Sequence, residues 1–468
     1  MSTTEPTTTS TVQPPLNDLA AQLHGRLIRP GDDSYDEARR VWNGMFDRRP
    51  LAIAQCADSD DVIAGVTFAR QQGLVVSVRG GAHSWPGYST TDGGLVIDLA
   101  PMKAITVDAT ARTVRAEGGV KWGELDRATQ EHGLAVTGGT NSDTGIAGLT
   151  LGGGIGWLQR AFGLSCDNLL AADVVSADGR LMRASADDHA DLFWGLRGGG
   201  GNFGIVTAFE YRLHPVGPVV LAGPILYPLE QAREVLAFQR SFMPTAPDEL
   251  MVFDLFLTVP PAPPFPEALY GQKLLFVVPL YVGPVDEGER VAAPLRQIGQ
   301  PIADAVQPMP YTVLQTTLDD ALPRGIRAWS SLSYLRQLDD AAIDLMAERF
   351  RGVPSPHSHV VIGRMDGAVT RVPQDATAFP QRAEQYVTWI VAGWPDETGD
   401  EANIKWARDF KAAIQPFATG STYVNAQSDE SVDPMQSGYV PGTYERLTDL
   451  KRKYDPTNLF RLNQNIMP

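Results

Sequence analysis

The chain has 468 residues, of which 43% are hydrophobic and 20% charged, and its formal net charge is −16 at pH 7. This length predicts two or three domains, and the composition is that of a globular protein. The acidic balance argues against nucleic-acid or anionic-membrane partners, which need a basic footprint, and favours small molecules. Two cysteines, Cys56 and Cys166, are too few for a disulfide framework. Together with the lack of an apolar run that could cross a bilayer, they indicate a cytoplasmic location.

The first predicted elements lead to a glycine cluster. Residues 1–17 are rich in Thr, Ser and Pro and predict a disordered tail. A short helix is expected at residues 19–26, and a second begins after Asp58 and ends at Gly73. The β-branched run at residues 74–78 then predicts a buried strand.

The first glycine cluster, residues 79–89, follows that strand directly. Gly80 and Gly81 lack the Cβ atoms that keep a ligand away, so backbone N–H groups can close on an anion such as a pyrophosphate. His83 lies within this cradle. Taken alone, the segment is equally compatible with an ordinary glycine turn and a solvated histidine.

Two further glycine clusters follow, at residues 145–157 and 198–204. So many glycines in one region indicate backbone packed directly against a flat or bulky ligand, although three unrelated loops are the simpler alternative. Between the clusters, short strands alternate with single helices, which indicates an α+β sheet unit. The expected elements are strands at residues 95–99, 104–107, 113–116 and 205–213, a helix at 122–131, and a hairpin of residues 169–176 and 181–184.

The composition changes after a linker at residues 214–218. The glycine clusters end there, which suits a domain that shapes a pocket instead of gripping a nucleotide. Helices and strands are expected to alternate through this region and on to the end of the chain. The expected helices are residues 229–242, 287–298, 339–350, 402–414 and 443–453, and the expected strands are 250–259, 274–282, 359–364 and 385–392.

Five motifs occur along the chain in an order that is typical of one known protein family. They are the His83 segment, the Gly-Gly-Gly-Ile-Gly-Trp-Leu run at residues 152–158, residues 163–169, residues 198–204 and the terminal residues 454–466. Together they resemble the berberine bridge enzyme-like FAD-linked oxidases of the vanillyl-alcohol oxidase and para-cresol methylhydroxylase superfamily. The resemblance implies an α+β fold with a two-part FAD-binding domain and an inserted substrate domain of antiparallel sheet and helices. The implied boundaries are 18–214 and 421–468 for the two FAD-binding parts, and 215–420 for the substrate domain.

The resemblance also implies FAD bound covalently through the 8α carbon to His83. Many relatives attach the flavin a second time through a cysteine, but Asn141 stands at that position here, so one link is expected. Cys166 lies in another motif and is expected to be a small buried hydrophobe. Thr144 falls where the family controls oxygen access. The implied cofactor-binding residues are Arg79, Gly80, Gly81, Ala82, His83, Ser84, Gly87, Tyr88, Thr144, Gly145, Gly148, Leu149, Gly152, Gly153, Gly154, Gly156, Trp157, Asp167, Asn168, Gly204, Ile205, Val206, Asn463, Gln464 and Asn465.

The catalytic base is not given by the family motif. Relatives often end a Tyr-x-Asn-Tyr motif with a catalytic tyrosine, whereas this chain has Ala426 there. His357 and His359 are the candidates at the start of a predicted strand, since a neutral histidine can accept a hydroxyl or amine proton. A metal site and solvent-exposed loop histidines are the alternatives. Further candidates for the pocket are Tyr439, Tyr423, Asp254 and Asp366.

These patterns predict a flavoprotein oxidase that takes hydride from an alcohol or amine carbon of a small organic substrate. Dioxygen is the expected electron acceptor, giving H₂O₂, and no metal is expected. A dehydrogenase or an oxygenating tailoring enzyme on the same fold is the first alternative. A flavin-binding protein without turnover is the second, because a fold does not guarantee a function.

Overall fold

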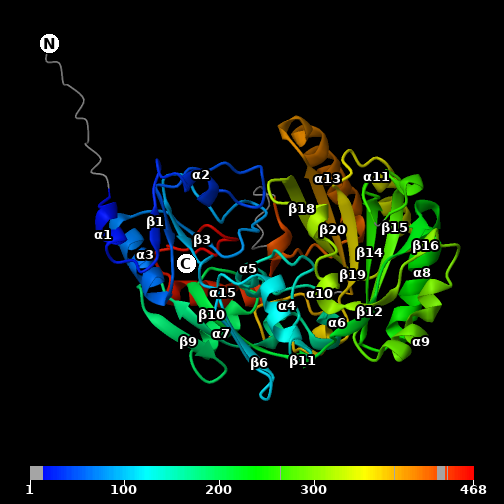
Figure 1. Ribbon diagram of the computed structural model, residues 1–468, viewed down its shortest axis with the longest axis horizontal. Helices are drawn as coiled ribbons and strands as arrows, with labels where there is room; N and C mark the ends of the chain where they lie inside the picture. Colours follow the sequence, from blue (N-terminus) through cyan, green and yellow to red (C-terminus); the bar gives the residue numbers. More distant parts are fainter. Residues whose placement is uncertain (1–13, 264, 384, 429–437, 440) are drawn as a thin grey trace, which may run out of the picture.

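The computed structural model describes residues 14–263, 265–383, 385–428, 438–439 and 441–468, in two lobes that lie side by side (Figure 1). The first lobe combines the N-terminal half with the C-terminal segment, and the middle of the chain forms the second. Most of the predicted tail lies outside the described residues, and helix α1 (Leu16–Ala20) occupies its last two positions. Among the described helices, none has both the length and the apolar character needed to cross a bilayer.

The helix predicted at residues 19–26 is wrong after Ala20, where α1 ends. The chain turns at Gly25, where an added Cβ would lie 2.0 Å from the carbonyl oxygen of Gln55. The amide of Gly25 donates to the Asp61 carboxylate at 2.9 Å. These contacts bring the next residues into a strand, β1 (Arg26–Ile28), that pairs with β2 (Ala52–Gln55).

A small sheet and the predicted capped helix begin the first lobe. The Asp58 carboxylate accepts hydrogen bonds from the amides of Asp60 and Asp61 at the start of α3 (Ser59–Gln72), and Gly73 ends the helix at a φ of 64°. The apolar face of α3 packs on the sheet β1-β2-β4-β3, in which β2, β4 and β3 are parallel. The remaining strands of this sheet are β3 (Val76–Arg79) and β4 (Leu95–Asp98).

A five-stranded antiparallel sheet of order β5-β6-β10-β8-β9 completes the first lobe. The predicted hairpin is confirmed, because β8 pairs with β9 around an Asp-Gly turn. The strands of this five-stranded sheet are β5 (Ile105–Asp108), β6 (Thr113–Glu117), β8 (Leu169–Val175), β9 (Leu181–Ser185) and β10 (Ile205–Arg212). The other elements of this lobe are α2 (Tyr35–Ala38), α4 (Trp122–Gln130), α5 (Ile146–Leu151), α6 (Gln159–Phe162), α7 (Ala190–Leu196), α15 (Pro441–Tyr454) and the short pair β7 (Leu134–Ala135) and β11 (His214–Pro215).

The second lobe is built on one antiparallel sheet, as the resemblance implied. Its order is β16-β13-β15-β14-β19-β20-β18, and β12 pairs with both β15 and β17 beside this path. The strand predicted at residues 359–364 is confirmed at both ends. The strands are β12 (Val219–Ala222), β13 (Ile225–Pro228), β14 (Leu250–Thr258), β15 (Lys273–Tyr281), β16 (Ala303–Asp304), β17 (Gln307–Pro310), β18 (Arg327–Leu335), β19 (His359–Arg364) and β20 (Tyr386–Trp394).

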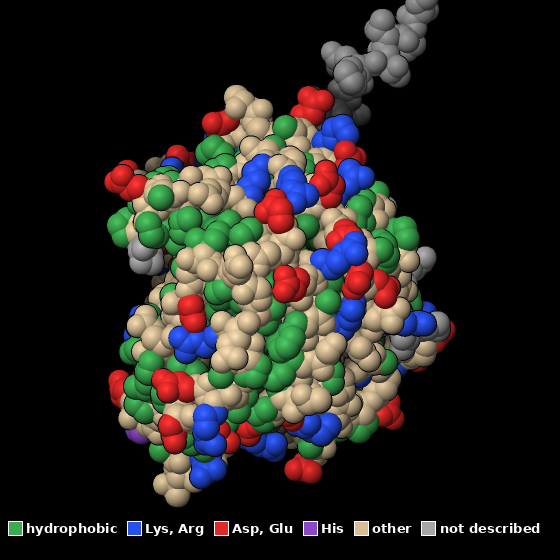
Figure 2. All heavy atoms as spheres, turned by 90° about the vertical axis from the view of Figure 1, so that its right-hand side faces the viewer, with side chains coloured by type: hydrophobic (Ala, Val, Ile, Leu, Met, Phe, Trp, Pro, Cys, Tyr) green, Lys and Arg blue, Asp and Glu red, His purple; other side chains and the backbone are tan. Residues whose placement is uncertain are grey.

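The two faces of this sheet have different partners. Because side chains alternate along a strand, Val252 and Phe256 of β14 face a helical layer, whereas Phe253 and Leu255 face the first lobe. The predicted helices form that layer with small shifts at their ends (Figure 1). They are α8 (Ala232–Phe242), α9 (Val285–Arg296), α11 (Asp340–Arg351) and α13 (Asp400–Ile414), and the short helices α10 (Tyr311–Leu314) and α12 (Ala368–Arg371) lie elsewhere in the lobe. On the outer end of the lobe, acidic and basic side chains are interspersed with apolar ones (Figure 2).

Asp254 of β14 is a buried carboxyl group under the helical layer. The side-chain amide of Gln239 donates a hydrogen bond to its Oδ1 at 2.8 Å. Burial raises the pKa of Asp254 to about 7, and the hydrogen bond from Gln239 opposes this only in part. The folded protein therefore keeps a proton that the unfolded chain releases near pH 4.

We expect Asp254→Asn to remove this pH dependence. The wild-type free energy of unfolding should fall as the pH rises from about 4 to 7, because the folded state binds the extra proton there. The introduced amide would keep an oxygen acceptor for Gln239, so the variant should exceed wild type by about 1 kcal/mol at pH 4.5 and by up to about 4 kcal/mol at pH 8. Urea unfolding at both pH values is the measurement, with Asp187→Asn on the surface as control. Equal slopes for wild type and Asp254→Asn would contradict the expectation.

Candidate active site

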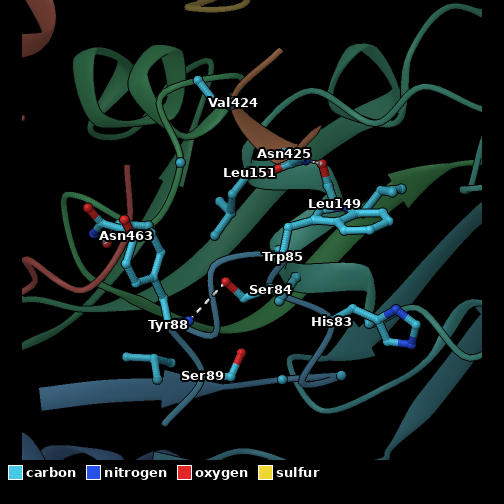
Figure 3. A pocket seen from close by; sticks show the side chains of 18 of the residues that line it. His83, Ser84, Trp85, Tyr88, Ser89, Leu149, Leu151, Val424, Asn425 and Asn463 are labelled. Carbon is cyan, nitrogen blue, oxygen red and sulfur yellow. Dashed lines mark hydrogen bonds between the residues drawn. The ribbon is translucent and has the colours of Figure 1, made fainter. Parts of the chain in front are cut away.

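A cavity of about 310 Å³ is lined by residues of the three glycine clusters, the C-terminal tail and the second lobe. His83 lies at one end of the lining seen in Figure 3, and Tyr88 and Asn463 lie at the other. The structure brings many of the predicted cofactor-binding residues together in the wall of this cavity. They are Gly80, Gly81, Ala82, His83, Ser84, Tyr88, Thr144, Gly145, Gly148, Leu149, Gly204, Ile205, Val206, Asn463 and Gln464.

The glycines in the wall have two different roles. A Cβ at Gly81 would lie 2.3 Å from the amide nitrogen of Gly145, and a Cβ at Gly145 would lie 2.4 Å from that of Gly81. The first and second glycine clusters therefore pack backbone against backbone. A Cβ at Gly148 or Gly201 would meet no atom within 4 Å, so these two positions leave open space beside the cavity.

Other predicted cofactor residues lie outside this wall. Asp167 accepts two hydrogen bonds from Arg382, at 2.6 and 2.8 Å, and so ties the first lobe to the second. A Cβ at Gly153 would lie 2.5 Å from the ring of Phe379, which shows that chain packing, and not a ligand, requires the glycine there. These predicted residues do not line the main cavity, although one of them, Trp157, lines a smaller cavity beside it. They are Arg79, Gly87, Gly152, Gly153, Gly154, Gly156, Trp157, Asp167, Asn168 and Asn465.

His83 is held by an aromatic ring and a carboxylate. Its imidazole stacks on Trp42 with ring centroids 5.1 Å apart, and its Nε2 lies 3.1 Å from Oδ2 of Asp143. Arg324 Nε lies 2.6 Å from the same oxygen, and the Lys121 ammonium contacts Oδ1. Burial raises the pKa of Asp143, but hydrogen bonds from His83, Lys121 and Arg324 outweigh it and hold that pKa well below the usual range.

The Asp143 contact fixes the protonation of the His83 ring. Burial lowers the pKa of His83, against the opposing effect of Asp143, so the imidazole is neutral at pH 7. A carboxylate accepts hydrogen bonds only, and Nε2 must therefore carry the ring proton. This leaves Nδ1 with a free lone pair, which is the form of histidine that acts as a nucleophile.

The candidate catalytic residues lie at different places. His359 lines a second cavity of about 70 Å³, which shares Trp85, Asn141 and Trp389 with the main one. Tyr439 lines the main cavity, and its hydroxyl donates to the carbonyl oxygen of Gly198 at 2.6 Å. His357 precedes β19 and lines neither cavity.

The modified Tyr-x-Asn motif also lies at the main cavity. Tyr423 accepts a hydrogen bond from the amide of Gly154 at 2.9 Å, and Asn425 donates to the carbonyl of Leu149 at 3.0 Å (Figure 3). Ala426 is fully buried and lines neither cavity.

The two acidic pocket candidates face other groups. Asp254 meets Gln239 under the helical layer, and Asp366 is paired with Arg160 and Arg364 at 2.9 and 2.7 Å. Neither carboxylate lines one of these cavities.

Three tryptophans in the walls had no role in the sequence-based predictions. Trp42 and Trp85 stand edge to face with centroids 4.9 Å apart, and Trp85 meets Trp389 at 6.0 Å. Trp85 lies within the first glycine cluster, and this position in the sequence could have indicated that it belongs to the site. Trp42 and Trp389 come from distant parts of the chain, and neither lies in a motif.

Comparison with known proteins agrees with this arrangement. Residues 50–185 match the family model described as FAD binding domain, and residues 422–467 match the one described as berberine and berberine like. The FAD-linked oxidoreductase YgaK of Bacillus subtilis is 32% identical over 460 residues, covering 96% of this chain and 98% of YgaK. The (R)-6-hydroxynicotine oxidase of Paenarthrobacter nicotinovorans is 29% identical, covering 95% and 97% of the two chains.

Solved structures give the same result for the fold. The crystal structure of 6-hydroxy-D-nicotine oxidase from Arthrobacter nicotinovorans superposes with a TM-score of 0.84 at 28% identity, covering 95% of this chain and 98% of the other. The berberine bridge enzyme-like protein 1 of Physcomitrella patens gives 0.85 at 23%, covering 97% and 99%. With the motifs in both parts of the first lobe and the cavity that they line, these matches show that the chain belongs to the berberine bridge enzyme-like family of FAD-linked oxidoreductases.

Proposed function

We propose that this oxidoreductase is an oxidase whose FAD is attached covalently to His83. The observation that carries the proposal is the state of His83, which lies in the cavity wall as a neutral imidazole with Nε2 held by Asp143 and Nδ1 free. Attachment at a ring nitrogen replaces one C–H bond of the flavin 8α-methyl group by an N–C bond. The C–H proton and the Nε2 proton of the imidazole would both be released, and together with the two electrons they would convert dioxygen to H₂O₂.

The residues of the main cavity fit FAD. Gly148 and Gly201 leave space where a side chain would fill it, so backbone can approach a large ligand there. No Asp, Glu, Lys or Arg among the described residues lines the cavity. Backbone N–H groups of the glycine clusters are therefore the groups expected to hold the pyrophosphate. Asn463 of the tail would close the site at the end opposite His83, and Gln464 lines the same cavity.

A bound flavin supplies a two-electron acceptor that dioxygen can reoxidise. The chain's own residues position it and exclude water: His83 anchors one end, and Trp42 packs against the anchoring imidazole. Thr144 lines the same cavity, and its modest side chain is compatible with access of dioxygen to the cofactor. On the side of the second lobe, the smaller cavity shares part of its wall with the main one and offers space for a substrate.

The test of this proposal separates an oxidase from a dehydrogenase. Substrate added without oxygen should bleach the flavin absorbance, and admission of air should restore it within one turnover while H₂O₂ appears in equal amount. Bleaching that only an artificial dye reverses would identify a dehydrogenase. An oxygenated product without H₂O₂ would identify an oxygenating tailoring enzyme.

The cysteines are expected to take no part in flavin attachment. Cys56 and Cys166 are both free and buried, which supports the cytoplasmic location expected from the sequence. Burial raises the pKa of the Cys166 thiol far above neutrality, with the neighbouring Asp167 acting in the same direction, and Cys166 does not line the main cavity. Since the thiolate is the reactive form, Cys166 cannot serve as a second anchor at pH 7.

We therefore expect Cys166→Ala to carry the same amount of covalent FAD as wild type. The measurement is flavin absorbance of protein that has been precipitated in acid and redissolved. Loss of the covalent flavin in a folded Cys166→Ala protein would contradict a linkage through His83 alone.

A further inference from the structure

A segment of the second lobe packs beside the His83 anchor. It covers residues 318–324, between helix α10 and strand β18, and we call it the strap. The Asp319 carboxylate of the strap accepts two hydrogen bonds from Ser142 of the first lobe, from the amide at 2.8 Å and from the hydroxyl at 2.5 Å. Ser142 directly precedes Asp143, so this contact holds the backbone of the residue that contacts the His83 ring.

Two backbone carbonyls of the strap extend this contact. The carbonyl oxygen of Leu318 accepts a hydrogen bond from the side-chain amide of Asn141 at 2.9 Å. That of Leu322 accepts one from Nε1 of Trp42 at 3.0 Å, and Trp42 is the ring on which the His83 imidazole stacks. Leu322 also lines both cavities. The strap therefore belongs to the site, and it fixes both the stacked ring and the chain that leads to the carboxylate partner of His83.

Arg324, the last residue of the strap, reaches the anchor itself. Its Nε lies 2.6 Å from Oδ2 of Asp143, which is the oxygen that faces Nε2 of His83. Its Nη2 donates to the carbonyl oxygen of Gly81, two residues before His83, at 2.9 Å. A guanidinium is planar and directs several donors at once, whereas an ammonium acts as a point charge. Arg324 therefore sets the position of the carboxylate relative to the loop that carries the nucleophile.

Attachment of a flavin makes a strict demand on this geometry. Nδ1 of His83 can attack only while the ring is neutral and its proton is on Nε2, which is the state that a hydrogen bond to Asp143 favours. The Asp143 side chain is 32% exposed, so burial alone does not fix its orientation. Misplacing a reacting group by about 1 Å can cost about 100-fold in rate. The contact from Arg324 is therefore expected to control how fast the link forms.

The charge of Arg324 has a second effect. The charged groups that face His83 are Asp143, Arg324 and Lys121. Burial lowers the pKa of His83, Asp143 opposes this, and the two cations act in the same direction as burial. Removing the Arg324 cation should therefore raise the pKa of His83 and keep the ring protonated up to a higher pH. A protonated ring has no lone pair for the attack.

We propose that the strap completes the site of FAD attachment and that Arg324 is its positioning residue. FAD held by the glycine clusters then becomes covalently linked only when the strap of the second lobe is docked on the first lobe. Arg324 forms and breaks no covalent bond. It holds Asp143 and Gly81 while Nδ1 of His83 bonds to the 8α carbon, and the two protons and two electrons that are released pass to dioxygen. This proposal rests on the proposed link at His83 and adds the control of its formation.

Attachment to apoprotein measures the role of Arg324 without substrate turnover. Protein produced under riboflavin starvation is mixed with saturating FAD, and the flavin absorbance of acid-precipitated samples gives the covalent fraction over time. Gel filtration gives the total FAD bound. Arg324→Met should attach FAD about 100-fold more slowly than wild type, while total bound FAD stays within about threefold. The matched control is Arg351→Met, because Arg351 is equally exposed on the second lobe and also pairs with carboxylates, and it should attach FAD at the wild-type rate.

The pH profile and a conservative variant separate positioning and charge from a loosened fold. The attachment rate should fall as the pH drops through the pKa of His83, and the midpoint should lie about 0.5 unit or more higher in Arg324→Met than in wild type. Arg324→Lys keeps the cation and should restore the wild-type midpoint. It loses the planar fork and should stay about tenfold slower than wild type. A variant that only disturbed packing would lower the rate equally at every pH, and this result would overturn the role of Arg324.

Asp319 tests the docking of the strap without a change beside His83. Asp319→Ala removes both acceptors of Ser142 and should slow attachment about tenfold, the effect of about 1.4 kcal/mol from two lost hydrogen bonds. Asp320 is the exposed neighbour, and Asp320→Ala should stay within about twofold of wild type. A wild-type rate in Asp319→Ala would overturn the requirement for a docked strap.

The remaining outcomes distinguish this proposal from the one on which it rests. If Arg324→Met attaches FAD at the wild-type rate, the positioning role is overturned and the link at His83 stands. If Arg324→Met and Arg324→Lys both fail to bind FAD, the strap serves FAD binding and not attachment, which also overturns the role. If wild-type protein binds FAD without ever attaching it, the proposed link at His83 is overturned, and the role of Arg324 with it.

Discussion

Replacing His83 by alanine should abolish covalent flavin attachment. Alanine offers no nucleophile, and no cysteine among the described residues lines the cavity to replace it. Protein precipitated in acid should be colourless, and any FAD should stay in the supernatant. The tryptic peptide that spans position 83 should carry the mass of FAD in wild type and lack it in the variant.

The control is a second histidine that lies far from the cavity. His132 is exposed after helix α4, and His132→Ala should keep all of the covalent flavin. If folded His83→Ala protein stays yellow after precipitation in acid, the anchor is another residue. An unmodified wild-type peptide at position 83, with FAD free in the supernatant, would also reject the covalent link and would leave the family membership untouched.

Local motifs singled out several residues that the structure brings together at one cavity. The loop with Gly80, Gly81 and His83 lines the main cavity, and Asn463 and Gln464 join it from the other end of the chain. Glycine patterns were ambiguous for a physical reason. An absent Cβ is needed equally where backbone meets a ligand, as at Gly148, and where it meets other parts of the protein, as at Gly153 against Phe379.

Features that depend on contacts between distant residues could not be predicted. Strand β18 was missed because Ser330, Ser331 and Ser333 make it look like a loop, yet these serines are buried in the sheet. The hydroxyl of Ser330 donates to the carbonyl of Ala426 and accepts from Nε1 of Trp389, which offsets the cost of its burial. Asp143 likewise shows its relation to His83 only in three dimensions, because 60 residues separate the two along the chain.

Removing Lys451 should cause a large loss of stability, and the reason lies in the terminal motif. Its side chain is fully buried, and the ammonium group donates to the carbonyls of Asn202 and Phe460, both at 2.9 Å, and to the carboxylate of Asp455 at 2.8 Å. This one group therefore joins helix α15, the third glycine cluster and the tail that carries Asn463. We expect Lys451→Met to lower the free energy of unfolding by about 3–5 kcal/mol, because it leaves the Asp455 charge buried without a partner.

Urea unfolding followed by tryptophan fluorescence measures this effect, and two further variants test its cause. Arg452→Met changes the exposed neighbour, which pairs with Asp449 in the same helix, and should stay within about 0.5 kcal/mol of wild type. Lys451→Met combined with Asp455→Asn removes both charges and should recover part of the loss, since the buried unpaired charge is then gone. A double variant that is less stable than Lys451→Met would show that the hydrogen bonds from the amides of Leu459 and Phe460 to Asp455 matter more than its charge.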